Sequence, residues 1–374
     1  MKNTIYKYFF HEFIRYFAVV IFALTAVIWT IQAVNFLDLV TDDGHAFLVY
    51  FFYSLLTLSK IITKLFPFSF LIASILTILK FEKDNELIVC WTSGLNKIYI
   101  VNLILRISFL IMFLQLLLTT LINPSLLNLS RTILKNSQLQ FIPSLLKEKQ
   151  FNDTIEGLTI FVEKKNKNQT YENIFIRDDS KILSKIGTTS STIFAKSGHI
   201  SKDDKFLVLF NGNIQKLEKD GNVNIVKFEK TTLNLSGMTT KSVSEPKIQE
   251  TSTISIVSCI MNKGTNIHNC SQNKKSLMDN KIEINKRFGM PFFIPVVALI
   301  CSFLLTSRKD KKIYSYNKYI YFFIGFAVLV ISEILVRFSG ISWNHTGLYY
   351  SLPFLLLPIF YFTLIRKFKY ENLF

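Results

Sequence analysis

Six apolar runs limit what this chain can fold into more than any other feature, because most approach or exceed the roughly 20 residues that a helix needs to cross a ~30 Å hydrocarbon core. A soluble core does not need runs of this length, and 50% of the 374 residues are hydrophobic. The sequence therefore predicts an α-helical integral membrane protein with three spans near each end of the chain. The runs are Phe13 to Leu37, Ala46 to Leu79, Ile98 to Ile122, Gly289 to Thr306, Tyr319 to Val336 and Leu348 to Ile365.

Charged residues beside these runs predict the topology. Basic residues precede the first run and acidic residues follow it, which places the N-terminus in the cytoplasm. The first run is also too long for a signal-peptide core, so we expect it to remain as a helix. The loop after the fourth span and the C-terminal tail are basic, whereas residues 339–347 carry no Lys or Arg. Both termini are therefore expected in the cytoplasm, with the segment between the third and fourth spans outside.

The formal charge of +17 would suggest a nucleic-acid partner in a soluble protein. Here many basic residues flank apolar runs, where they set topology and meet anionic lipid, so no nucleic acid is expected. The chain contains no G-x-x-x-x-G-K-[ST] phosphate loop, no H-E-x-x-H motif and no other metal-ligand cluster. We therefore expect no catalytic residue, metal or cofactor in this chain and no ATP hydrolysis through a phosphate loop, so that any catalysis would belong to a partner.

The segment from Asn123 to Lys286 has a different pattern. Short alternating stretches such as LTIFVE and STIFAK replace the long apolar runs, which is typical of strands. Asn211-Gly212 and Asp220-Gly221 suit two-residue hairpin turns, so they predict a three-strand meander. The expected architecture is an extracytoplasmic antiparallel β domain of sandwich or jelly-roll type at 123–286, inserted between helical segments 1–122 and 287–374.

Two cysteines share the outer segment, where disulfides can persist. Cys259 and Cys270 are close enough in sequence for a bridge, but two small residues in a polar segment explain them as well. Cys90 and Cys301 lie on the cytoplasmic side or in the membrane, so no disulfide is expected there.

A short polar stretch between the second and third spans is helix-forming up to Gly94, a suitable C-terminal cap, and predicts a cytoplasmic helix near 82–94. Its sequence DNELIVCWTSG, Asp84 to Gly94, is similar to the cytoplasmic coupling segment of the LptF/LptG family, the permeases of lipopolysaccharide export. IEINKRFGMPFFIPVVALI, Ile282 to Ile300, resembles the re-entry of that family into the membrane. The resemblance covers essentially the whole chain.

The sequence departs from the family pattern at two places. Trp91 and Thr92 stand where many relatives have a basic residue, and a basic residue often found late in the first helix is replaced by Gln32, Asn35 and Asp38. No residue role is therefore transferred from the family to the first helix. The FLDLV sequence at the end of that helix looks more like the LptF branch than the LptG branch.

The resemblance implies an ATP-driven exporter. It implies a bacterial inner-membrane heterodimer of this chain with a second LptF/LptG-type permease, on a cytoplasmic ATPase dimer of the LptB type. Such a complex extracts lipopolysaccharide from the outer leaflet of the inner membrane and passes it to periplasmic β proteins of the LptC/LptA type. This chain would be a transporter subunit and not an enzyme.

The predicted coupling helix has a physical logic. A short amphipathic helix can dock Leu87, Ile88 and Trp91 into a groove of a cytoplasmic partner, with Gly94 ending the helix. Glu86 would add a charge-assisted contact that transmits movement. The alternative is a solvated charge in an ordinary loop.

Lys60 and Lys64 are candidates for binding lipid phosphate. They lie 20 and 16 residues before Lys80, about 30 and 24 Å along a helix, which is near the outer interface. One turn separates them, so they share a helix face. The alternative is that both are interface lysines that extend to water.

Two further pairs are weaker candidates for the lipid. Glu333 and Arg337 stand one turn apart near the outer end of the fifth span, where they suit an ion pair or the wall of a lipid cavity. Arg131 and Lys135 follow the third span, and either lipid phosphate or water explains them.

Two other functions compete with export. A receptor with an outer β sensor would normally need a cytoplasmic output domain, and no cytoplasmic segment here is long enough to fold. A secondary transporter would place polar sites at mid-membrane in two related halves. Only export requires a bound ATPase. Export would also use an exposed edge strand of the β domain to accept a strand from a periplasmic β protein.

Overall fold

The structure is a computed structural model, and it describes residues 2–41, 46–136, 146, 148–153, 157–166, 170–179, 190–201, 206–217, 223–234, 247–261, 270, 274–306 and 314–371. Its internal contacts divide the chain into two compact units. The helical unit comprises residues 1–30, 57–128 and 247–374, and the second unit comprises residues 31–56 and 129–246.

Six helical segments of the described residues are long and apolar enough to cross a membrane, three before the strands and three after them. The predicted helical membrane protein with an inserted β domain is therefore confirmed. The segments are Thr4–Thr41, Phe47–Lys83, Lys97–Lys135, Lys274–Thr306, Tyr316–Ser339 and Trp343–Tyr370.

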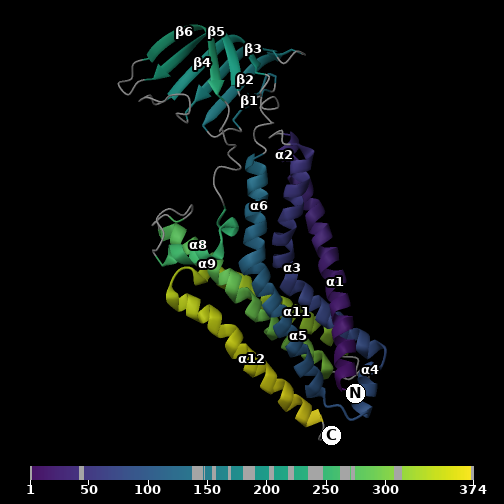
Figure 1. Cartoon of the computed structure of the whole chain (residues 1–374). Helices are drawn as coiled ribbons and strands as arrows, with labels where there is room; N and C mark the ends of the chain where they lie inside the picture. Colours follow the sequence, from purple (N-terminus) through teal and green to yellow (C-terminus); the bar gives the residue numbers. More distant parts are fainter. Residues whose placement is uncertain are drawn as a thin grey trace. The chain divides into compact units, whose positions relative to one another are not determined.

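The helices that form these segments are shown in Figure 1. The first three segments contain α1 (Lys2–Asn35), α2 (Asp38–Thr41), α3 (Phe47–Lys83), α5 (Lys97–Leu117), the π-helical turn η1 (Leu118–Ile122) and α6 (Asn123–Asn136). The last three contain α9 (Lys274–Gly289), the 3-10 turn η4 (Met290–Phe292), α10 (Phe293–Ser302), the 3-10 turn η5 (Phe303–Thr306), α11 (Tyr314–Ser339) and α12 (Trp343–Glu371). Shorter helices are α4 (Glu86–Thr92), the 3-10 turn η3 (Ile248–Glu250) and α8 (Thr253–Ile260).

Helix α10 forms the centre of the helical unit, and each of its residues from Phe293 to Ser302 is buried. A helix that is apolar on all sides must be enclosed by protein or by lipid. The fourth segment is enclosed by protein, since 78% of its most apolar window is buried, against 11% for the first and 17% for the fifth and sixth. The apolar faces of α1, α11 and α12 are thus left for lipid or another protein.

The second unit contains one six-stranded antiparallel sheet with the strands in sequence order (Figure 1). Alternate side chains of β2, such as Leu158, Ile160 and Val162, are buried, which is the period-two pattern of a half-buried strand. The sequential order makes the described strands a meander, without the Greek-key crossovers that a jelly roll has. The strands are β1 (Phe151–Asn152), β2 (Leu158–Lys165), β3 (Thr170–Asp178), β4 (Ser190–Ile200), β5 (Phe206–Leu217) and β6 (Val223–Asn234).

One predicted turn is wrong. Asn211-Gly212 lies inside β5, which pairs with β4 on one side and with β6 on the other. Asn211 has a positive φ of 51°, as a hairpin residue would, but the strand continues through it. Gly212 is needed because a Cβ there would lie 2.1 Å from the Phe194 carbonyl oxygen. The second predicted turn, Asp220-Gly221, lies outside the described residues, although β5 and β6 do pair as a hairpin.

Helices flank the strands within the segment that we assigned to the β domain. The strands occupy Phe151 to Asn234, whereas α6, α8 and most of α9 also fall between 123 and 286. The helical period of KKSLMDNKIEINKRFG was hidden by its many polar residues, several of which are buried against other parts of the helical unit. Asn280, Asn285 and Arg287 are the buried polar residues on it.

Candidate functional site

Helix α4 is a two-turn helix bounded by left-handed backbone on each side. Asn85 precedes it with φ 60°, and Gly94 follows it with φ 81°. A glycine adopts such a φ without steric cost, and open space surrounds the position where a Cβ would be. The left-handed backbone at Asn85 and Gly94 interrupts the helix on each side, so α4 is a short helix separate from α3 and α5.

The apolar residues of α4 divide into two groups. Leu87 is only 6% exposed and Trp91 packs partly against the same core, so both contact this chain itself. Ile88 and Val89 are 50% and 65% exposed. The exposed apolar surface of α4 therefore consists of Ile88 and Val89, and Leu87 is not available for a partner's groove.

Glu86 is tied to the first helix. Its Oε1 accepts a hydrogen bond of 3.0 Å from the hydroxyl of Tyr8. The ring of Tyr8 lies 5.8 Å from the ammonium of Lys80, and Lys80 forms a 2.8 Å ion pair with the largely buried Glu12. Tyr8, Glu12 and Lys80 were not predicted as a group from the sequence, although the carboxylate of Glu12 among the apolar residues at the start of α1 indicated that it needs a partner.

The thiol of Cys90 also lies on α4. Burial, with the charge of Glu86 as the second cause, raises the pKa of Cys90 above its usual value. The thiol is therefore protonated at neutral pH, which fits a packing residue and not a reactive one.

A cavity of about 320 Å³ opens in the helical unit between α3, α5, α9 and α11. Its walls carry Lys60 and Lys64, which we predicted to share a helix face, and also Lys286, Arg287, Glu283 and Glu333 from α9 and α11. Lys60 is half-buried and Lys64 is exposed. The cavity thus brings together charged residues of α3, α9 and α11, which the sequence alone did not place near one another.

The partner of Glu333 differs from the predicted one. Its Oε1 pairs with the ammonium of Lys286 on α9, whereas Arg337 is exposed. The spacing of one turn would allow an i,i+4 pair between Glu333 and Arg337. Lys286 lies on a neighbouring helix at the same depth, and Glu333 pairs with it instead. Glu333 and Lys286 both line the cavity, and Arg337 is not among its lining residues.

Arg287 is the most highly connected residue of this region. It is 3% exposed, and its guanidinium donates to Glu283, to Thr253 and to the carbonyls of Ile248, Gln249 and Thr251. These bonds attach the segment before α8 to α9. Arg287 is therefore occupied by its own chain and is not free to bind a ligand.

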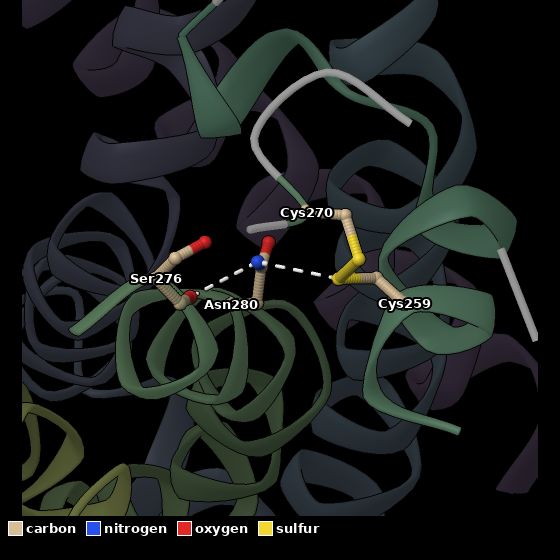
Figure 2. The surroundings of a disulfide bond; sticks show 4 residues. All are labelled: Cys259, Cys270, Ser276 and Asn280. Carbon is tan, nitrogen blue, oxygen red and sulfur yellow. Dashed lines mark hydrogen bonds between the residues drawn. A yellow bond between two sulfur atoms is a disulfide. The ribbon is translucent and has the colours of Figure 1, made fainter. Parts of the chain in front are cut away.

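A disulfide joins Cys259 of α8 to Cys270 (Figure 2). Beside it, the amide of Asn280 on α9 donates to the carbonyl of Ser276 and points to the sulfur of Cys259, 3.7 Å away. The bridge joins two cysteines that are 11 residues apart, and its Cys259 sulfur contacts α9 through Asn280. Arg131 and Lys135, the remaining lipid candidates, lie one turn apart on the part of α6 that belongs to the second unit.

Comparison with known proteins gives two matches to this chain, one to a family and one to a single relative. A sequence model of one family, described as "Lipopolysaccharide export system permease LptF/LptG", matches residues 7–367. An uncharacterized protein of Rickettsia prowazekii (strain Madrid E) is 27% identical over 234 residues. That alignment covers 61% of this chain and 62% of the relative, so it spans less than two thirds of either.

Proposed function

This chain belongs to the LptF/LptG family of lipopolysaccharide export permeases, and from this premise we propose that it extracts lipopolysaccharide with energy from a separate ATPase. In this proposal a cytoplasmic ATPase dimer of the LptB type drives it. The lipid leaves the outer leaflet of the inner membrane and passes to periplasmic β proteins of the LptC/LptA type. Because the family model covers both branches, assignment to the LptF branch stays a prediction.

The arrangement of the helical unit supports the orientation that this requires. The start of α1, helix α4 and the end of α12 lie at one end of the unit: Tyr8 contacts Glu86, and Lys97 lies within 5.8 Å of both the Trp91 and Phe368 rings (Figure 1). Arg366, Lys367 and Lys369 add positive charge at this end, as expected on the cytoplasmic side. The disulfide of Cys259 lies beyond the opposite end of α5, which suits an oxidising compartment.

The observation that carries the proposal is the exposed pair Ile88 and Val89. Both lie on α4, which falls between the second and third membrane segments and belongs to neither of them. Exposed apolar residues beside an acidic one are what a groove on a partner protein would bind. Only the export proposal places an ATPase there.

The test is co-purification of the ATPase with this chain. We expect the Ile88→Asp, Val89→Asp double variant to lose at least nine tenths of the bound ATPase, because two charges would enter an apolar groove. The matched control is Ile254→Asp on α8, which is 78% exposed at the opposite end of the helical unit and should retain the ATPase. Retention by the double variant would contradict the docking role of α4, and a wild-type chain that never binds an ATPase would favour a secondary transporter.

Three of the membrane segments support a second permease as partner. The apolar faces of α1, α11 and α12 are mostly uncovered within this chain. Lipid covers part of such surfaces, and a second LptF/LptG-type subunit would cover the rest. In this proposal the two permeases meet through these helices.

Strand β6 is the best site for a periplasmic β protein. It is the last strand of the sheet, it has 12 residues, and no described strand pairs with its outer edge. Val223, Ile225 and Val226 on it are 57%, 56% and 47% exposed. A long apolar edge with unpaired backbone groups is a template for strand addition. At the other edge β1 is only two residues long and pairs with Phe161 and Ile160 of β2.

Photo-crosslinking can locate the docking edge. A photoreactive residue at Ile225 is expected to give adducts with the periplasmic β partner, since that side chain lies on the open edge strand. The same residue at Lys196, exposed on the central strand β4, is the control and should give none. Adducts from Thr159 of β2 in place of Ile225 would move the docking site to the opposite edge.

A further inference from the structure

We propose that the cavity between α3, α5, α9 and α11 binds the phosphate group of an anionic membrane lipid, with Lys60 and Lys64 as its ligands. The proposal deepens the proposed function and takes from it only the orientation of the chain. The phosphate can belong to a glycolipid such as lipid A or to a glycerophospholipid, and the chemistry of recognition is the same. The cavity volume of about 320 Å³ has room for on the order of ten waters, so a phosphate group fits.

The cavity wall carries more positive than negative side chains. Its two carboxylates are already paired, Glu283 with Arg287 and Glu333 with Lys286. Neither Lys60 nor Lys64 forms an ion pair with any carboxylate in the part of the chain that the structure describes. Two ammonium groups one turn apart that form no ion pair repel each other and are costly at membrane depth. A phosphate would supply the missing negative charge to both.

The polarity of the lining residues changes along the cavity. On α3, Lys60 and Lys64 come before Pro67 and Phe68, and on α9 the charged Glu283, Lys286 and Arg287 come before Met290. On α11, which runs the opposite way, the order is reversed: Phe326, Leu329 and Val330 come before Glu333.

The charged residues of these helices lie near one another, and so do the apolar residues. Lys286 pairs with Glu333, the ring centroids of Phe68 and Phe326 are 5.7 Å apart, and Ser332 contacts Met290. All three helices therefore place charge at one end of the cavity and apolar side chains at the other. This is the order of a lipid from its phosphate to its acyl chains.

One buried polar group of the cavity wall has no hydrogen-bond partner among the described residues. Gln115 lines the cavity and is 2% exposed, yet its Oε1 accepts no hydrogen bond from any described residue. A buried acceptor without a donor is costly, so a ligand hydroxyl or amide N–H would satisfy it. Sugar and glycerol headgroups carry such donors beside their phosphate. The π-helical turn Leu118–Ile122 follows directly and includes Thr119, another lining residue; such turns often accompany functional sites.

The test is lipid binding to the purified full chain in dodecyl maltoside, a detergent without phosphate, followed by native mass spectrometry. Lipid A and phosphatidylglycerol are the two phosphate-bearing probes, and diacylglycerol is the probe without phosphate. We expect Lys60→Gln, Lys64→Gln to weaken binding of the preferred phosphate-bearing lipid at least tenfold. Lys60→Arg, Lys64→Arg keeps both charges and should stay within threefold of wild type.

The matched control removes the same charge elsewhere. Lys274 and Lys275 are exposed at the start of α9, away from the cavity wall, and Lys274→Gln, Lys275→Gln should bind as wild type does. Tighter binding of lipid A or of phosphatidylglycerol identifies the source of the phosphate. The proposal is overturned if diacylglycerol binds equally well, if only inorganic phosphate binds, or if the Lys60, Lys64 glutamine variant matches wild type. Because no ATPase or export is involved, failure here leaves the proposed function standing.

Discussion

Glu86→Ala is expected to leave the protein inserted in the membrane and to reduce lipopolysaccharide export at least tenfold. Glu86 begins the short helix α4 beside the exposed Ile88 and Val89, where a basic residue of a partner ATPase can reach its carboxylate. Hydrogen bonds to charged groups contribute about 1.5–3 kcal/mol, which corresponds to a tenfold or larger change in coupling. Export of labelled lipopolysaccharide from proteoliposomes, with the amount of inserted protein as reference, measures the effect.

Tyr8→Phe separates two explanations for such a loss. The Tyr8 hydroxyl donates to Glu86 within this chain, so Glu86 could act by fixing α4 against α1. If Tyr8→Phe exports normally while Glu86→Ala does not, the carboxylate acts on the partner. Equal losses would assign Glu86 to positioning α4, and normal export by Glu86→Ala would reject a role for this residue in coupling.

Arg287→Met should have the largest effect on stability, a loss of about 3–5 kcal/mol, because it leaves the carboxylate of Glu283 and several carbonyls unpaired in a buried site. Arg287 is 3% exposed and makes five hydrogen bonds, three of them to backbone carbonyls of Ile248, Gln249 and Thr251. Lysine keeps the charge but not the planar fork of donors, so Arg287→Lys should recover only part of the loss. Thermal or denaturant unfolding in detergent is the measurement.

Two controls test whether the loss of stability comes from the buried contacts of Arg287 and not from its charge alone. Arg337→Met removes a positive charge from an exposed site on α11 and should change stability by less than about 0.5 kcal/mol. Adding Glu283→Gln to Arg287→Met should restore part of the stability, since the double variant no longer buries an unpaired carboxylate. Equal losses in Arg287→Met and Arg337→Met would show that the bonds of Arg287 contribute little.

Much of the fold could be predicted because its signals are local. Long apolar runs indicated six spans, since a helix satisfies its own backbone hydrogen bonds in lipid. Alternation at Leu158 to Val162 indicated a strand, since every second side chain is buried. Asn211-Gly212 misled the prediction, because positive φ is needed both in a hairpin turn and at a bend within a strand, and only the neighbouring strands distinguish the two.

The candidate site was predicted in parts. Lys60 and Lys64 share a helix face by spacing alone, and the structure adds that both line one cavity. Glu86 and Ile88 were assigned together to α4, but Leu87 is buried in this chain's own core. A seven-residue helix has too few apolar positions to show which of its faces packs internally.

By itself the sequence determined how many segments can enter the membrane, which flanks carry positive charge and where strands replace helices, because each depends on residues close together in the chain. Only the tertiary structure decided that Glu333 pairs with Lys286, 47 residues away, and that Gln115 lines the same cavity as Lys60. Such partners are chosen by which helices lie side by side at the same depth. That choice is made by the packing of α9, α10 and α11, and no spacing along a single helix contains it.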